Sequence, residues 1–232
     1  MQALDDFVPV GPADMAGCTL AQLVAQHERP LHCTDMDFSE QDLSRINLQG
    51  VRFERCQFAA SNLTAADLSA SHWIACRGAH AVFRNAVLTD ARFERCDLNN
   101  SQWHRSKLAH VHFQGCKLTG ASFIDVASLG LSFSDCLLRS ACLSGISFFK
   151  SQLHNLDFTE ADLTYCDFRK AVFVDGGSLS LARVNNARFD EADLREASLH
   201  GLRLVDANLF KGAIISRSQA SMLLAGLGLT VL

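Results

Sequence analysis

Residues 52–68 read RFERCQFAASNLTAADL, and this stretch contains the pattern that decides the fold. Its large apolar residues fall at positions 53, 58, 63 and 68, five residues apart. The same spacing runs from Phe38 to Phe173 and, after one inserted residue near Gly176–Gly177, from Leu179 to Ile214. Of these 36 positions, 30 are Leu or Phe. A period of five fits neither an α-helix nor a flat strand, so the spacing predicts short repeats that stack as coils.

Each five-residue unit has two apolar positions and three polar ones. The second apolar position lies two residues before each Leu or Phe and holds a small residue, at Cys56, Ala66, Cys76, Ala81, Ala86, Ala91, Cys96, Ala121, Ala161, Ala171, Ala187, Ala192, Ala197 and Ala207. The position between them is often Asp or Asn. A chain that turns once per unit buries both apolar positions, and four units then make a square coil of 20 residues.

The cysteines support this coil length independently. Cys56, Cys76, Cys96, Cys116 and Cys136 are spaced 20 residues apart at the small position. We therefore expect one interior column of free thiols, because side chains in register on parallel strands do not point at one another as a disulfide requires.

The repeated unit resembles the pentapeptide-repeat family, whose signature is Ala-(Asp/Asn)-Leu-x-x. The signature occurs as written at 66–68, 161–163, 192–194 and 207–209. The resemblance covers residues 34–215 and implies an all-β solenoid, a right-handed quadrilateral β-helix of about nine coils. Gly78 and Ser128 depart from the ladder, and we expect bulges or a widened coil there. Trp73 and Trp103 are large for a narrow interior and could also distort it.

The two ends of the chain differ from the repeat. We divide the chain into an N-terminal cap segment (1–33), the repeat (34–215), and a C-terminal helix with a dimerisation tail (216–232). The pattern from Thr19 to Gln22 is a capping box, which predicts a helix at about 19–28. Ser218 and Gly226 predict the limits of a second helix.

Composition excludes several classes of protein. The formal net charge is −4, with acids and bases in both halves, which does not suggest an electrostatic nucleic-acid binder. The first ten residues lack the basic region of a signal peptide. The longest apolar stretch, 222–232, is too short to span a bilayer. These features predict a cytoplasmic protein with reduced cysteines and no membrane association.

No pattern predicts a catalytic or cofactor site, so we expect a protein that is not an enzyme and needs no cofactor. Two sets of residues are candidate metal ligands. Cys18, His27, His32 and Cys33 match no standard zinc spacing. His110 and His112 are expected on neighbouring faces that flank a corner. Both sets are better explained as cap or surface residues, and we predict no metal site.

Two outward-facing groups are candidates for partner binding. The first is a column of Arg52, His72, Arg92 and His112, spaced 20 residues apart, with Arg55 and Arg95 beside it. The alternative is that Glu54 and Glu94 neutralise it. The second group is Leu129 and Phe149, apolar residues one coil apart that either mark an interface or are buried by a local change of register.

The C-terminal run from Ser216 to Leu232 resembles the end of the quinolone-resistance (Qnr) group within this family. That resemblance implies a homodimer formed tail to tail, which imitates DNA and protects DNA gyrase or topoisomerase IV, both type II topoisomerases. It also implies the dimer contacts Leu223, Leu224, Leu227, Leu229 and Val231. The absence of ejected loops and the modest acidity favour the alternative, a general interaction scaffold, adaptor or immunity-type protein with an unrelated protein partner.

Overall fold

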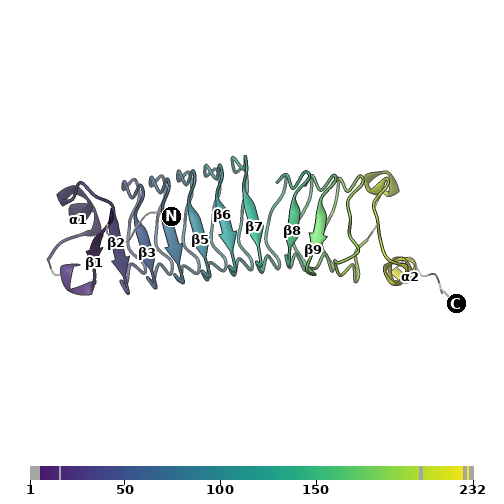
Figure 1. Ribbon diagram of the computed structural model, residues 1–232, viewed down its shortest axis with the longest axis horizontal. Helices are drawn as coiled ribbons and strands as arrows, with labels where there is room; N and C mark the ends of the chain where they lie inside the picture. Colours follow the sequence, from purple (N-terminus) through teal and green to yellow (C-terminus); the bar gives the residue numbers. More distant parts are fainter. Residues whose placement is uncertain (1–5, 16, 204–205, 227–228, 230–232) are drawn as a thin grey trace. The chain divides into compact units, whose positions relative to one another are not determined.

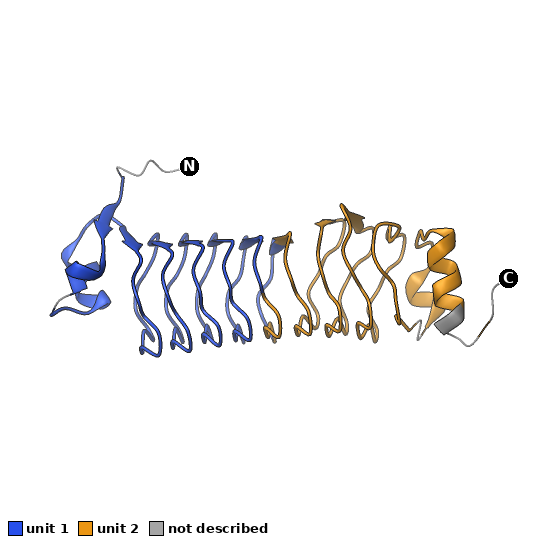
Figure 2. Ribbon diagram, turned by 90° about the horizontal axis from the view of Figure 1, so that it is seen from below, with its two compact units in different colours: residues 1–117, 125–132 blue, residues 118–124, 133–232 orange. Residues whose placement is uncertain are grey.

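The computed structural model describes residues 6–15, 17–203, 206–226 and 229. It is a parallel β-solenoid of about eight turns with two short helices (Figure 1). The predicted fold class is confirmed, with about eight turns where about nine were expected. The chain divides into two compact units, residues 1–117 with 125–132 and residues 118–124 with 133–232 (Figure 2).

Successive coils are joined by backbone hydrogen bonds that repeat every 20 residues. The N–H of Phe58 donates to Arg77 O over 2.6 Å, and the N–H of Arg77 donates back to Cys56 O over 3.0 Å. The pairs Gln57–Arg77 and Arg77–Asp97 are parallel bridges. Because both bonding directions of each coil are used, the interior coils leave few backbone groups without a partner.

One side of each coil is extended enough to form short strands. In the first unit these are β1 (Val8–Val10), β2 (Leu31–Thr34), β3 (Arg52–Glu54), β4 (His72–Ile74), β5 (Arg92–Glu94) and β6 (His112–Gln114), in chain order. In the second unit β8 (Gln152–His154) pairs with β9 (Val172–Val174). The remaining strand, β7 (Ser132–Ser134), spans the boundary between the units.

The corners of the coils require a left-handed backbone. Along most of the ladder the second residue after each ladder residue has positive φ, as at Arg55 (φ 54°), Ala60 (φ 54°) and Ala65 (φ 57°). Residues with a Cβ visit this region rarely, so the hydrogen bonds between coils must hold them there. The five-residue spacing indicated a turn but not this conformation.

The inserted residue near Gly176–Gly177 is absorbed at one corner. Bridges that cross the insertion join residues 21 apart, as in Asp162–Arg183. Beyond it the spacing is 20 at Ser178–Ser198 and again 21 at Asp193–Ile214. Gly177 has φ 115°, and a Cβ there would lie 2.8 Å from Leu156 O. Only glycine fits this corner, and the coil beyond it continues in register.

The ladder residues form the core. Phe53, Phe58, Leu63 and Leu68 are fully buried, as are both tryptophans. Each indole N–H has a buried partner, since Trp73 donates to Ser71 Oγ over 2.9 Å and Trp103 donates to Ser101 Oγ over 2.8 Å. The tryptophans therefore fit the interior without leaving a polar group unpaired.

The expected bulge at Gly78 is wrong. Its N–H donates to Asp97 O over 2.7 Å, as in a regular coil. A Cβ on Gly78 would lie 3.0 Å from Leu98 Cδ2. Leu98 thus occupies the space that a larger ladder side chain would need, while the large ring of Trp73 fills the interior five residues earlier.

The cysteine column is present. Cys56, Cys76, Cys96, Cys116 and Cys136 are buried and free. The thiols of Cys56, Cys76, Cys96 and Cys116 each point to a backbone carbonyl 23 residues earlier, for example Cys96 Sγ to Trp73 O over 3.4 Å. Burial raises the pKa of Cys96, and it raises the pKa values of Cys33 and Cys166 to about 12. These thiols serve as small core residues.

The helices at the two ends begin at capping boxes. Helix α1 (Leu20–Gln26) starts after Thr19, whose side chain bonds reciprocally with Gln22, and it ends two residues earlier than predicted. Helix α2 (Arg217–Gly226) starts after Ser216, not at Ser218. Gln219 N donates to Ser216 Oγ over 3.2 Å, and Ser216 N donates to Gln219 Oε1 over 2.6 Å.

Two 3₁₀ helices complete the ends, η2 (Pro12–Met15) and η3 (Ala207–Phe210). The signature at 207–209 therefore does not form a regular coil. Asp206 caps η3 by accepting from Asn208 N over 2.9 Å, and Phe210 stacks on Phe189 with ring centroids 4.7 Å apart. The cap changes the backbone here although the repeat pattern continues in sequence.

Gln219 closes the last coil. Its side chain is nearly buried, and Nε2 donates to Leu194 O and to Ala197 O, both over 2.7 Å. An open coil end would leave such carbonyls without partners. One amide side chain thus replaces part of the hydrogen bonding that a further coil would provide.

We predict that Gln219→Leu lowers the free energy of unfolding by about 1–3 kcal/mol, because it leaves buried carbonyls without their donor. Urea denaturation followed by circular dichroism measures the change. Gln152→Ala, on the exposed edge of β8, is the matched control and should have little effect. Equal stability of Gln219→Leu and the unmodified protein would show that the amide does not close the coil.

Candidate functional site

The strand pairing of the first unit aligns the predicted basic column. Arg52 pairs with His72, His72 with Arg92, and Arg92 with His112, all in parallel register. Arg55 and Arg95 follow at the left-handed corners of their coils. The structure therefore brings the six residues to one side of the first unit, while their role in binding stays a prediction.

Acidic side chains neutralise one end of this column. Glu54 contacts His32 Nε2 at 3.2 Å, Arg52 Nη2 at 3.6 Å, and Arg55 Nη1. Arg55 also binds Asp35 through Nε and Nη2, each over 2.8 Å. Burial acts to raise the pKa of Glu54, but the hydrogen bond with His32 and the neighbouring arginines together lower it. The hydrogen bond from Arg55 lowers the pKa of Asp35.

The contacts of His72 fix its tautomer. Its Nδ1 lies 3.3 Å from Arg52 Nη1, and its Nε2 lies 2.8 Å from Glu94 Oε1. An arginine can only donate, so Nδ1 of His72 is the acceptor. Nε2 therefore carries the hydrogen and donates a hydrogen bond to Glu94. Among the described side chains, Arg52 Nε is the single buried polar atom without a partner. The strongest contacts of this cluster are therefore internal.

Arg92 and Arg95 differ from the rest of the column. Both are exposed, and within the described ranges neither forms an ion pair. His112 pairs with Arg92 on the next coil, and its Nδ1 lies 2.8 Å from Ser132 Oγ. The proposed neutralisation by Glu54 and Glu94 thus holds for Arg52, Arg55 and His72, and Arg92 and Arg95 remain available to a partner.

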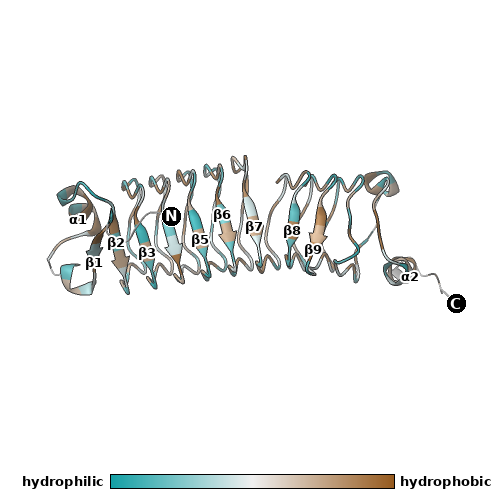
Figure 3. Ribbon diagram, viewed as in Figure 1, coloured by the Kyte–Doolittle hydropathy of each residue, from teal (hydrophilic) through white to brown (hydrophobic). Residues whose placement is uncertain are grey.

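The hydropathy of the strands changes along the chain. Figure 3 shows β5 as hydrophilic and β9 as hydrophobic. The outward residues of β5 are Arg92 and Glu94, whereas those of β9 are Val172 and Val174. The charged column is thus a feature of the first unit.

The candidate metal ligands do not form a site. Among the residues that the structure describes, no three His, Cys, Asp or Glu side chains are grouped to hold a metal ion. His110 packs over Gly130, where a Cβ would overlap its ring. None of the described helices is long and apolar enough to cross a membrane.

The outward apolar candidates are exposed. Leu129 has 77% of its surface accessible and Phe149 has 44%, so a change of register that buries them is excluded. The sequence did not predict the surroundings of Phe149. Lys150 Nζ and Arg169 Cζ lie 5.1 and 5.2 Å from its ring centroid, which places two cations within cation–π distance of an exposed ring.

The structure describes three of the five C-terminal candidates. Leu223 is nearly buried, Leu224 is 38% exposed, and Leu229 is 55% exposed. Leu227 and Val231 lie outside the described residues. Leu223 also lines an apolar hollow of about 120 Å³ with Leu194, Leu199, Leu202, Phe210, Ala213 and Ile215. Ile214, which the ladder predicted to point inward, is 48% exposed and pairs with Asp193 rather than lying at a ladder position. Together with the exposed Ile215 and Met222 it enlarges this surface.

Comparison with known families decides the affiliation. The family model "Pentapeptide repeat region" matches residues 46–123, and "Pentapeptide repeats (8 copies)" matches residues 132–175 and 178–209. Together they cover about two thirds of the chain. The chain belongs to the pentapeptide-repeat proteins.

Solved structures of pentapeptide-repeat proteins share the fold. Full-length QnrB1, a plasmid-mediated fluoroquinolone resistance protein, matches with a TM-score of 0.75 at 23% identity, over 85% of this chain and 100% of QnrB1. A trypsin-treated form of QnrB1 matches with a TM-score of 0.73 at 24% identity, over 86% of this chain and 99% of the other. At this identity the likeness shows the fold alone. No curated protein sequence matches this pentapeptide-repeat protein significantly.

We predict a pH dependence of stability that involves Glu54. Its pKa is lowered in the folded state, so its contribution is present above the unfolded value of about 4.3 and is lost as the pH falls through the folded value. Glu54→Gln should therefore be less stable than the unmodified protein at pH 7, and the two urea midpoints should converge toward pH 3.

The matched control is Glu28→Gln, which changes an exposed carboxylate that has no ion pair among the described residues. Its urea midpoint should follow that of the unmodified protein at every pH. A constant difference between Glu54→Gln and the unmodified protein from pH 7 to pH 3 would contradict the assignment to charge.

Proposed function

We propose that this pentapeptide-repeat protein is a non-catalytic, cytoplasmic protein that binds a type II topoisomerase and modulates or protects it. The observation that carries the proposal is the likeness to QnrB1, which extends over the whole of that chain, at a TM-score of 0.75. QnrB1 is a fluoroquinolone resistance protein, and the sequence resemblance to the same group implies gyrase or topoisomerase IV as the partner.

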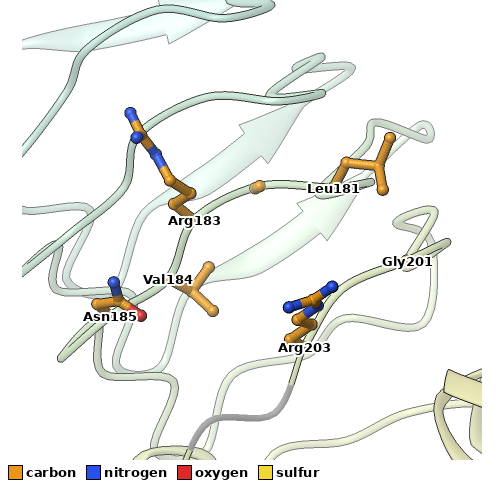
Figure 4. A pocket seen from close by; sticks show the side chains of 7 residues that line it. Leu181, Arg183, Val184, Asn185, Gly201 and Arg203 are labelled. Carbon is orange, nitrogen blue, oxygen red and sulfur yellow. The ribbon is translucent and has the colours of Figure 1, made fainter. Parts of the chain in front are cut away.

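The surface supports binding more than catalysis. The hollows found on the described residues have volumes of about 390 Å³ (Figure 4) and 120 Å³ and are partly open to solvent, whereas enzymes commonly act in clefts that enclose most of the ligand. Arg92 and Arg95, which form no ion pair with another described residue, are suited to a protein contact, since arginine is enriched at binding hot spots. We assign the partner-binding role to the side of the first unit that carries them.

A homodimer through the C-terminal segment is part of the proposal. Exposed apolar side chains occur in the same segment as Leu223, which lines the smaller hollow. They are Ile214, Ile215, Met222, Leu224 and Leu229. Covering each large apolar side chain is worth about 1.5–3 kcal/mol. A second copy of the chain, related by a two-fold axis, would cover this surface on both subunits at once.

The charge distribution favours a second candidate function, a general interaction scaffold, adaptor or immunity-type protein. A protein that imitates DNA needs a dense negative surface. Here the net charge is −4, and many carboxylates already pair with arginines, as Asp167 does with Arg169 and Asp193 with Arg195. A scaffold with an unrelated protein partner does not require an acidic surface.

We predict that the purified protein restores DNA supercoiling by gyrase in the presence of a fluoroquinolone. Agarose-gel supercoiling assays with and without drug, over a range of protein concentrations, measure the effect. The double variant Arg92→Glu, Arg95→Glu should lose at least about tenfold in potency, since it reverses two free cations at the proposed contact. The matched control Arg45→Glu changes an arginine on another side of the same unit.

The outcomes of this assay separate the two functions. No protection at any concentration, together with no gyrase binding in a pull-down, favours the scaffold. Protection that survives the double variant leaves the topoisomerase function in place and moves the contact to another surface.

We predict that the protein is a dimer at micromolar concentration. The double variant Leu224→Asp, Leu229→Asp should be a monomer that keeps its β-rich circular dichroism spectrum. Both leucines are partly exposed to solvent, so the substitutions place charge on the proposed dimer contact without entering the buried core. Multi-angle light scattering measures the mass. Ile124→Asp, an exposed apolar residue outside the C-terminal segment, is the control and should remain dimeric. A monomeric mass for the unmodified protein would contradict the proposed dimer.

A further inference from the structure

The thiols of the first unit repeat one geometry on successive coils. The four cysteines concerned are Cys56, Cys76, Cys96 and Cys116, and none forms a disulfide. Each Sγ lies 3.4 or 3.5 Å from the carbonyl oxygen 23 residues earlier. Each also lies 3.4 or 3.5 Å from the carbonyl oxygen two residues earlier. Because these contacts recur on every coil, the sulfur atoms occupy equivalent places and form a row.

The separation of neighbouring sulfur atoms follows from the pairing of the coils. The residues that come directly after the cysteines pair in parallel register, as Gln57 does with Arg77 and Arg77 with Asp97. Paired strands are about 4.8 Å apart, so neighbouring sulfur atoms have about the same separation. A hydrogen bond with the Cys76 thiol raises the pKa of Cys56, so adjacent thiols are close enough to interact.

A metal ion fits midway between two such sulfur atoms. Half of the spacing is about 2.4 Å, close to the length of about 2.3 Å that a zinc–thiolate bond has. The two sulfur atoms lie on opposite sides of the midpoint, which is the arrangement of linear coordination. The Cβ–Sγ bonds point into the coil, across the direction of the row, so a cation in the row approaches each sulfur from the side.

The surroundings exclude cations that need more ligands. The four cysteines are at most 1% exposed, in an interior of ladder rings such as Phe53 and Phe93. Within the described ranges, no three His, Cys, Asp or Glu side chains converge on one point. Structural zinc requires four ligands, and calcium requires six to eight oxygen atoms. A gap in the row offers two sulfur atoms and therefore suits only a cation that accepts two soft ligands.

We propose that adjacent thiols of this row bind a soft monovalent d10 cation, Cu(I) in a cell, with each cation held linearly between two sulfur atoms. Thiolate sulfur is a ligand that selects Cu(I). Each cation takes the place of one thiol proton, which leaves to solvent. Three cations thus displace three of the four protons, and loading adds no net charge to the apolar interior, where an unpaired charge is costly.

The row has three gaps, Cys56–Cys76, Cys76–Cys96 and Cys96–Cys116. The two middle cysteines each border two gaps and would bridge two cations. Metal sites are commonly recognised in a sequence by short ligand spacings, which a 20-residue period does not have. The site is independent of the proposed topoisomerase function, because it lies in the interior and uses none of the surface residues assigned to the partner.

The test refolds the full reduced chain from urea without oxygen, because the buried thiols are accessible while the chain folds. Cu(I) is supplied together with bathocuproine disulfonate, a chelator that removes Cu(I) from isolated thiols. We expect the folded protein to retain Cu(I), and X-ray absorption to show two sulfur neighbours for each copper. Ag(I) is the second probe and should be retained in the same number. Zn²⁺, supplied with EDTA, should not be retained.

The variants change the number of retained cations in different ways. Cys96→Ala removes a thiol that borders two gaps and should lose two cations, whereas Cys56→Ala, at the end of the row, should lose one. Cys166→Ala is the matched control, because Cys166 is equally buried and its Sγ lies 3.1 Å from the carbonyl oxygen 23 residues earlier. The equivalent residues on the coils beside it are Ile146 and Ala187, so this variant should lose none.

The alanine variants are expected to fold, because alanine already occupies the same inward position at Ala66 and Ala86, where it is fully buried. Circular dichroism verifies this, and Cys56→Ala keeps the test decisive if Cys96→Ala does not fold. Loss of one cation from every variant, the control included, would show binding to single thiols and overturn the row. Three or more ligands for each copper would overturn linear coordination. No retained Cu(I) or Ag(I) would overturn the site, whatever the gyrase assay shows.

Discussion

The parallel hydrogen-bond ladder between coils is the constraint on which the rest of this structure depends. Most ladder residues donate to the coil that follows, and the residue before donates to the coil that precedes, as Phe58 and Gln57 do. This pairing holds the corners in a left-handed conformation that Arg55 or Ala60 would rarely adopt alone. It also sets the alignment of surface side chains, since a residue and the one 20 positions later occupy equivalent places.

Much of the fold could be predicted because burial and period are both visible in the sequence. The ladder from Phe38 to Phe173 and the cysteine spacing fixed the coil length, and the capping box at Thr19 located α1. What could not be predicted depends on three-dimensional compensation. In the sequence Gly78 looks like a defect, but Leu98, Ala81 and Phe58 occupy the space beside it. At Ala207–Phe210 the repeat pattern continues in the sequence, yet the backbone forms a 3₁₀ helix that the Asp206 side chain caps.

For the candidate site, the sequence predicted the alignment but not the contacts. Spacing alone placed Arg52, His72, Arg92 and His112 in one row, as the strand register has them. It could not say that Arg55 would bind Asp35 on the preceding coil while Arg95 remained free, because that depends on side-chain reach between coils.

Because interior coils meet identical neighbours on both sides, the first unit has an unusual freedom in evolution. The segment from Arg52 to Cys56 recurs from Arg92 to Cys96, two coils later. Excision or duplication of that 40-residue block would join like residues to like, with the thiol column and the ladder unbroken. The hydrogen bonds of Gln219 to Leu194 and Ala197 lie outside this block and would be unaffected. The number of repeats in such a chain can therefore change by whole coils.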